Sequence, residues 1–419
     1  MAAREKVTVD WPLVASALVL SLYGIAIVYS AGQTDIPTYV ARAWKAQIGW
    51  FVLGLAGAYA ISRASVRMIE WLTVPLYVLT ITLLFALLFI GRGAGTAEST
   101  KSWLVLGGIR LGQPSEIAKL TVVLMLGKVL SASKDPPKTL VELWKPALVV
   151  GIPWMLIVAQ KDVGTSIVFI GIFFAMLFWS GISWRLLLLI ASPIVSLILT
   201  GVSTSVWGAW FLLLLALVIW YKPYLWEGVF VVGANVVMGV VAPILWDRLQ
   251  PYQQNRLKVF LDPSIDPRRS GYHVIQSQVA IGSGGWFGKG YTAGTQKRLA
   301  FLPAQHTDFV FAVLGEELGF FGVTLALALF LSLFLRVIRI AERANDSYSS
   351  LIAFGLLASW FVHVLENVGM TLNLMPITGI PLPFFSYGGS FMLASWLAIG
   401  VLVRIAHEGR GGKHGPFAI

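Results

Sequence analysis

Long apolar runs separated by short polar segments make up most of this chain. About twelve of these runs approach the roughly 20 residues that an α-helix needs to cross a bilayer core. They centre on residues 13–30, 48–61, 74–90, 116–130, 147–158, 166–179, 186–200, 206–220, 229–245, 308–335, 351–371 and 386–405. The pattern predicts an all-α polytopic membrane protein in which residues 1–419 form one integral-membrane domain.

Composition supports this class. Hydrophobic residues make up 57% of the chain and charged residues 12%, half the roughly 25% charged residues of soluble domains. A soluble enzyme is therefore excluded. The chain has no cysteine, which excludes disulfides, thiolate metal sites and a cysteine nucleophile. No cleavage pattern precedes the first apolar run, so we expect a membrane span there and not a removable signal.

The net charge of +11 does not call for a nucleic-acid partner. The basic residues lie mostly in short loops between the predicted spans. If the N-terminus is cytoplasmic, most of these loops are cytoplasmic too, as the positive-inside rule requires. We therefore expect the membrane, and no nucleic acid, to account for the charge.

One long segment, residues 247–307, is predicted to lie outside the cell. It is too long for the positive-inside rule to govern its charge, and loops of this length are usually functional or disordered. Its apolar stretch 272–281 favours an ordered loop, and its cations favour an anionic ligand. The cations are Arg248, Arg256, Lys258, Arg268, Arg269, Lys289, Lys297 and Arg298.

Segment 301–320 contains the most unusual polar residues. His306 and Asp308 stand at the mouth of an apolar run, and Glu316 and Glu317 lie inside it. Ionisable side chains at membrane depth are costly and indicate function. On a helix, Ala312, Gly315 and Gly319 would lie within about 40° of Asp308, a small-residue stripe that admits a second backbone. We therefore expect Asp308 to face protein or a water-filled cavity, and the deeper glutamates to be structural.

Glu116 and Lys119 follow a helix-start signal, Pro114 and Ser115. One turn apart, they can pair on one helix face near the outer surface. Two interpretations stay open. The pair is either a capping Glu and a snorkelling Lys, or a carboxylate and cation that line the same cavity as Asp308.

Three further segments carry weaker signals. Asp162, between two spans, is more typical of a loop cap than of a catalyst. The glycine-rich stretch 282–290 does not match a nucleotide-binding spacing, so we expect tight turns beside a ligand or the membrane surface. Segment 367–390 is broken by Pro and Gly, which at membrane depth requires burial in protein or a cavity wall. We expect it to wall the same outward cavity. No histidine pair has metal-ligand spacing.

Taken in order, six motifs resemble the SEDS family, the membrane peptidoglycan glycosyltransferases that include RodA, FtsW and SpoVE. Segments 261–267 and 294–296 resemble the RodA branch more than FtsW. The six motifs are Pro114-Ser-Glu-Ile-Ala-Lys119, Asp162-Val-Gly-Thr165, Gly271-Tyr-His273, Ala280-Ile-Gly-Ser-Gly-Gly285, His306-Thr-Asp-Phe309 and Ser386-Tyr-Gly-Gly-Ser390.

The resemblance implies a SEDS-type helical bundle with ten spans, so the two helices predicted within residues 203–246 would be an inserted pair. Three residues depart from the family pattern. Lys161 stands where Pro is usual, Ala304 where Glu is common, and Asn373 where Gly is usual. We assign no carboxylate role to position 304.

The resemblance also implies a reaction: polymerisation of lipid II into glycan strands for cell elongation, by inverting transfer with undecaprenyl pyrophosphate as leaving group. Asp308 resembles the family's catalytic Asp and would be the general base. Arg256, Lys119 and Arg110 would hold pyrophosphate, and Glu116 would orient Lys119. The supporting residues would be Asp162, His306, Gln276 and Ser386. Mg²⁺ or Mn²⁺ is compatible with this chemistry, but the sequence shows no ligand set.

The expected partners are lipid II, the nascent glycan, a class B penicillin-binding protein and the elongation machinery. The expected location is the bacterial inner membrane, with the active site facing outward. Three alternatives remain open: a lipid II flippase, a division polymerase of the FtsW type, and a scaffold that only recruits a transpeptidase.

Overall fold

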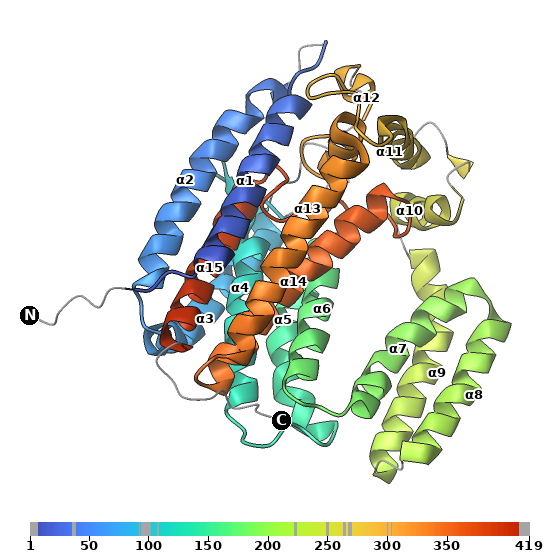
Figure 1. The fold of residues 1–419 in the computed structure, drawn as a ribbon. Coiled ribbons are helices and arrows are strands. Elements are labelled where there is room, and N and C mark those ends of the chain that lie inside the picture. Colours follow the sequence, from blue (N-terminus) through green and yellow to red (C-terminus); the bar gives the residue numbers. More distant parts are fainter. Residues whose placement is uncertain are drawn as a thin grey trace, which may run out of the picture.

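A computed structural model describes residues 7–35, 39–91, 93, 102–106, 109–221, 224–248, 251–262, 265–266, 270–299, 301–302 and 304–409. Each predicted apolar run coincides with a helix (Figure 1). These helices are α1 (Trp11–Ala31), α2 (Ala43–Ser62), α3 (Val66–Ile90), α4 (Pro114–Ser131), α5 (Trp144–Ala159), α6 (Val163–Trp179), α7 (Trp184–Val202), α8 (Thr204–Tyr221), α9 (Leu225–Arg248), α13 (Val310–Glu342), α14 (Ser347–Thr371) and α15 (Gly389–Gly409). Short 3₁₀ turns, η1 (Tyr39–Arg42) and η2 (Val141–Leu143), precede α2 and α5.

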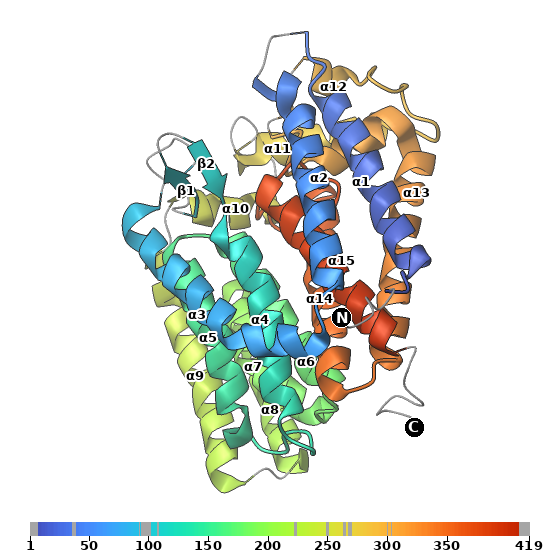
Figure 2. The ribbon, with the colours of Figure 1, turned by 90° about the vertical axis from the view of Figure 1, so that its left-hand side faces the viewer.

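Within the described residues, nine helices are long and apolar enough to cross a membrane. The other three of the twelve are α2, α4 and α6. The number of spans therefore stays a prediction. The most buried candidate spans are α14 and α15, and the least buried are α8 and α9. The core thus lies around α14 and α15, which α1, α2, α4, α6 and α13 surround (Figures 1 and 2).

Helices α7, α8 and α9 form a separate group beside the main bundle (Figure 1). Their own small core is Leu189, Leu214 and Val231. Polar contacts reinforce it, because buried Asn235 donates to Ser192 Oγ (2.8 Å) and accepts from Ser196 Oγ (2.6 Å). Side-chain hydrogen bonds of this kind join helices in a membrane. Residues 203–246 are thus a helix pair, as predicted, while its status as an insertion stays a prediction.

The long segment after α9 is ordered into α10 (Pro251–Leu261), α11 (Ser270–Gly284) and α12 (Thr295–Arg298). These helices gather at the end of the bundle where α13 begins (Figures 1 and 2). A β-hairpin of β1 (Leu104–Leu106) and β2 (Ile109–Gly112) lies at the same end (Figure 2). The all-α prediction is confirmed, with this small hairpin as an addition.

The predicted small-residue stripe on α13 does admit another backbone. A Cβ placed on Gly284 of α11 would stand only 2.0 Å from the Gly315 carbonyl oxygen. Gly319 has φ +60° and interrupts the helix, and a Cβ there would lie 2.4 Å from the Gly288 nitrogen. Gly284 and Gly288 therefore pack tightly against α13, which gives these two glycines a structural reason to lack a side chain.

Candidate functional site

Asp308 lies in a turn before α13, which begins at Val310, and not on the helix as predicted. The backbone N–H groups of Thr307, Asp308 and Phe309 all point to the Ala304 carbonyl oxygen, at 3.0, 3.1 and 3.3 Å. Ala304 has φ +49°, a left-handed conformation that closes the turn. The residue that replaces the family's usual Glu therefore shapes the backbone under Asp308.

Three distant groups hold this turn in place. Ser386 Oγ donates to the Thr307 carbonyl (2.5 Å), Tyr387 N to the His306 carbonyl (2.9 Å), and Asn367 Nδ2 to the Asp308 carbonyl (2.9 Å). The structure thus brings together Asp308, His306 and Ser386, all predicted from the sequence. Because these contacts engage backbone atoms, the Asp308 carboxyl stays available for other partners.

The Asp308 carboxyl is half-buried and packs against Gly379, where a Cβ would come within 3.3 Å of Oδ2. Burial raises the pKa of Asp308 to about 6, although a hydrogen bond from Thr307 and the charge of Arg256 oppose the shift. Burial lowers the pKa of His306 to about 4. At neutral pH the turn therefore holds an ionised carboxylate beside a neutral imidazole.

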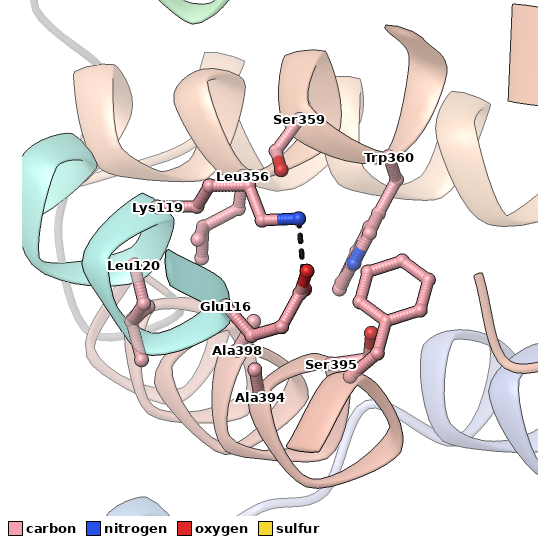
Figure 3. Close-up of a pocket in the computed structure, with 10 residues that line it drawn as sticks. Glu116, Lys119, Leu120, Leu356, Ser359, Trp360, Ala394, Ser395 and Ala398 are labelled. Atoms are coloured by element: carbon pink, nitrogen blue, oxygen red, sulfur yellow. Dashed lines mark ion pairs between the residues drawn. The ribbon is translucent and has the colours of Figure 1, made fainter. Parts of the chain in front are cut away.

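Glu116 and Lys119 form a buried ion pair on α4, with Lys119 Nζ 2.8 Å from Glu116 Oε2 (Figure 3). Lys119 also donates to His363 Nε2 (2.7 Å), and the His363 Nδ1–H donates to the Pro381 carbonyl (3.0 Å). Since an ammonium only donates and a carbonyl only accepts, both contacts fix the same His363 tautomer. The pair lies between α14 and α15 beside a cavity of about 20 Å³, room for about one water molecule.

Asp162 caps α6, accepting a hydrogen bond from Thr165 N (3.1 Å), so the cap interpretation is confirmed. It also accepts from Gln113 Nε2 (2.8 Å), which ties the start of α6 to the start of α4. Burial raises the pKa of Asp162, against the hydrogen bonds from Thr165 and Gln113 and the charge of Lys119. Asp162 therefore belongs to the same polar region as the α4 ion pair.

The irregular segment 377–388 joins the two groups of residues. Gly379 packs on Asp308, the Ile380 carbonyl accepts from Asn367 (2.8 Å), and the Pro381 carbonyl accepts from His363. A Cβ on Gly164 of α6 would meet the Ile380 side chain at 2.7 Å. The segment thus contacts both groups.

The remaining predicted residues lie around the turn. Arg256 is exposed on α10, and its charge influences both Asp308 and His273 of α11. Gln276 is half-buried on α11, one turn after His273. The Arg110 backbone pairs with Val105 in the hairpin, whereas its side chain falls outside the described part of the structure. Among the described residues, no three His, Cys, Asp or Glu side chains are placed to hold a metal ion.

Sequence reasoning missed three polar residues of α14. His363 contacts Lys119, and Asn367 donates a hydrogen bond to the Asp308 turn. Glu366 is 1% exposed and lies within electrostatic range of Lys119 and Asp162. Their spacing of three and four positions places them on one face of a predicted span. That pattern could have predicted their location, because polar residues on one face of a membrane helix usually face the interior of the protein.

Glu316 and Glu317 are structural, as expected. Glu316 pairs with Lys289 and Glu317 with Lys297, at 2.8 and 2.6 Å. Arg298 pairs with Asp35 (3.0 Å). The protein's own carboxylates thus engage three of the loop cations, and the expectation that the loop meets an anionic ligand stays a prediction.

We predict that His363→Leu lowers the free energy of unfolding by about 1–3 kcal/mol, because it leaves a buried ammonium and a buried carbonyl each short of a partner. Thermal unfolding of the purified protein measures this. His363→Gln should lose much less, since glutamine offers both an acceptor and a donor. The control is Leu365→Ala at a half-exposed position of the same helix. Equal losses for the Leu and Gln variants would contradict the bridging role of His363.

Sequence comparisons connect this arrangement to known proteins. The FtsW/RodA/SpoVE family model, described as a cell cycle protein, matches residues 10–214 and 203–411. The chain is 35% identical over 404 residues to the peptidoglycan glycosyltransferase MrdB of Escherichia coli K12, covering 96% of this chain and 94% of the relative. It is also 35% identical to the peptidoglycan glycosyltransferase RodA of Treponema pallidum, over 94% of this chain and 97% of the relative.

Solved structures have the same fold. A chain from a study of how a peptidoglycan synthase complex coordinates polymerization and crosslinking superposes with a TM-score of 0.71 at 28% identity, covering 95% of this chain and 98% of that one. The rod shape determining protein RodA of Thermus thermophilus gives 0.62 at 26% identity, over 97% and 99% of the two chains.

Proposed function

This chain belongs to the FtsW/RodA/SpoVE family, and from that membership we propose that it polymerises lipid II into glycan strands during cell elongation. It is a peptidoglycan glycosyltransferase, like the relatives it matches along nearly its whole length. The single observation that carries the proposed mechanism is the Asp308 turn. Its backbone is fixed by three distant residues while its carboxyl stays half-buried and ionisable near neutral pH.

In the proposed reaction, the 4-hydroxyl of the acceptor N-acetylglucosamine attacks the anomeric carbon of the donor's reducing-end sugar. A new carbon–oxygen bond forms as the bond to undecaprenyl pyrophosphate breaks, and the electron pair leaves with the pyrophosphate. Asp308 accepts the hydroxyl proton, as a general base within hydrogen-bond reach would. The elevated pKa suits this role, because the group accepts a proton readily and is still ionised at pH 7.

Cationic groups would stabilise the departing pyrophosphate. Arg256 is the first candidate for this role, since its side chain is exposed and its positive charge is close enough to Asp308 to lower the pKa of that carboxyl. Arg110 remains a second candidate. Lys119 is 3% exposed and engaged by Glu116 and His363, so it would need to exchange a partner to reach the substrate. A divalent cation remains compatible with the leaving-group task.

We further propose that the site faces outward from the bacterial inner membrane. The positive-inside rule supports this orientation, which puts α10–α12 and Asp308 on the outer side. A solved neighbour concerns the coordination of polymerization and crosslinking, which supports a transpeptidase partner. We propose a class B penicillin-binding protein in that role, as part of the elongation machinery.

A lipid II flippase is the second candidate, because buried ionisable groups such as Glu366 lie inside the bundle. A flippase would place its substrate site near the membrane midplane. Asp308 lies instead just before the start of α13, and α10–α12 gather at that end of the bundle (Figure 1), which favours chemistry at the membrane surface. Transport of lipid II across vesicles by an Asp308→Ala variant, with no polymer from the wild type, would support the flippase.

The pH dependence tests the base directly. Because the carboxylate must be ionised and its pKa is raised to about 6, kcat/KM should be constant at higher pH and fall about tenfold per unit below about pH 6. An ordinary aspartate would place this limb near pH 4. Arg256→Gln should move the limb to higher pH, because the Arg256 charge lowers the pKa of Asp308. A limb near pH 4 would contradict the raised pKa of Asp308, and a limb that Arg256→Gln leaves in place would contradict its assignment to Asp308.

A further inference from the structure

Four aromatic rings form an exposed cluster beside the break in α13. Trp286 and Phe287, on the turn after α11, are 65% and 79% exposed, and Phe320 and Phe321 are both 54% exposed. The Trp286 ring lies 5.0 Å from Phe320 and 6.1 Å from Phe321, and Phe287 lies 5.1 Å from Phe321. An exposed apolar patch of this kind typically marks a site of contact with a protein or a membrane.

The cluster marks the place where the environment of α13 changes. Residues 310–317 are all buried in protein, whereas from Phe320 onward large apolar side chains are exposed at intervals, among them Leu325, Leu331 and Leu335. Arg336 follows, about 24 Å further along the helix, close to the roughly 30 Å of a bilayer core. The exposed face of α13 therefore has the length of a lipid-facing surface, and the cluster stands at its end.

The two halves of the cluster are held together by backbone. Phe320 N donates to the Gly285 carbonyl (2.9 Å), Phe321 N to the Trp286 carbonyl (3.2 Å), and Gly290 N to the Glu317 carbonyl (3.0 Å). A Cβ on Gly288 would meet the Glu317 carbonyl oxygen at 2.0 Å, so the two backbones can approach this closely only because residue 288 is a glycine. The rings are thus presented on a fixed support.

We propose that Trp286, Phe287, Phe320 and Phe321 form an anchor seated in the interfacial layer of the leaflet on the Asp308 side. Trp favours this layer, where apolar tails meet polar headgroups, and Phe joins Trp on the apolar face of segments that lie in the interface. The lipid surface is the occupant we favour, because the cluster continues the lipid-facing side of α13. A partner protein docked on the same rings is the alternative that the experiment distinguishes.

The anchor has a consequence for the proposed function, on which this step rests. Asp308 lies two residues before α13, and Gly319 follows about two and a half turns into that helix. Between these two points, Lys289 N and Gly290 N donate to the Glu316 and Glu317 carbonyls. An anchor at this point sets the height of the Asp308 turn above the leaflet. The pyrophosphate of a lipid-linked sugar lies at that same surface, so a fixed height would help to bring the two together.

The chain has no cysteine, so single-cysteine variants can carry a nitroxide label without background. We would label Phe287→Cys, with Trp286→Cys as a second position, in lipid nanodiscs. Two matched controls bracket the depth: Leu331→Cys on the exposed face of α13, and Gln278→Cys on an exposed position of α11. The measurement is the relaxation of each label by oxygen, which concentrates in lipid, and by a water-soluble nickel chelate.

Labels at 286 and 287 are expected to show an oxygen-to-nickel ratio several-fold above that at 278 and below that at 331. A ratio equal to that at 278 would place the cluster in water and overturn the proposal. Protection from both reagents would show a protein on the cluster and overturn it equally. The depth measurement needs no activity, so it can succeed even where lipid II polymerisation is absent.

Discussion

Asp308→Ala is expected to reduce the rate of glycan polymerisation by about 100-fold or more, the scale of a lost general base. The variant removes the only proposed proton acceptor while leaving the turn intact, because Ser386, Tyr387 and Asn367 all bond to backbone atoms. The rate is measured with purified, folded protein and lipid II. Unchanged thermal unfolding would show that the loss is chemical.

Asp35→Asn is the matched control. Asp35 is a half-exposed carboxylate that pairs with Arg298 at the same end of the molecule, so its loss should leave polymerisation near the wild-type rate. Near-normal polymer from Asp308→Ala would remove the case for Asp308 as base. It would favour either the flippase or a scaffold that only recruits a transpeptidase.

The second large effect is on stability. Lys297 and Glu317 are both 0% exposed and lie 2.6 Å apart, and Lys297 also donates to Ser30 Oγ. Lys297→Met leaves the Glu317 carboxylate buried without its cation, which should cost about 3–5 kcal/mol. A fall in the unfolding temperature of the purified protein measures this loss.

Two further variants control this prediction. Arg298→Met breaks the neighbouring exposed pair and should cost no more than about 1 kcal/mol. The double variant Lys297→Met/Glu317→Leu removes both charges and should recover most of the stability, since apolar replacements of a buried pair are often neutral. If the double variant is no more stable than Lys297→Met, the loss comes from packing and not from the stranded charge.

The helices could be predicted because each apolar run is about as long as a helix that spans a bilayer core. Every one of the twelve runs coincides with a helix, and the small residues of α13 correctly indicated a close backbone contact. The local pattern is sufficient in these cases because a segment that spans lipid must satisfy its backbone hydrogen bonds internally, which a helix does.

The site was less predictable because its decisive contacts are long-range. The periodicity of the run placed Asp308 on a helix, but Ser386 holds its turn from 79 positions away. Lys119 finds His363 across 244 positions. The sequence around each of these residues does not indicate which distant residue it contacts. The glycine break at 319 likewise depends on the turn after α11, where the Gly285 and Trp286 carbonyls accept hydrogen bonds from Phe320 N and Phe321 N.

Glycan synthesis from lipid II at Asp308 is the reaction that we propose for this chain. Its most direct test is gel analysis of the polymer formed when purified wild-type protein, with and without a class B penicillin-binding protein, is given lipid II alone. We expect a ladder of glycan strands from the wild type and none above background from Asp308→Ala. No polymer from folded wild-type protein under either condition, or equal ladders from both proteins, would contradict it.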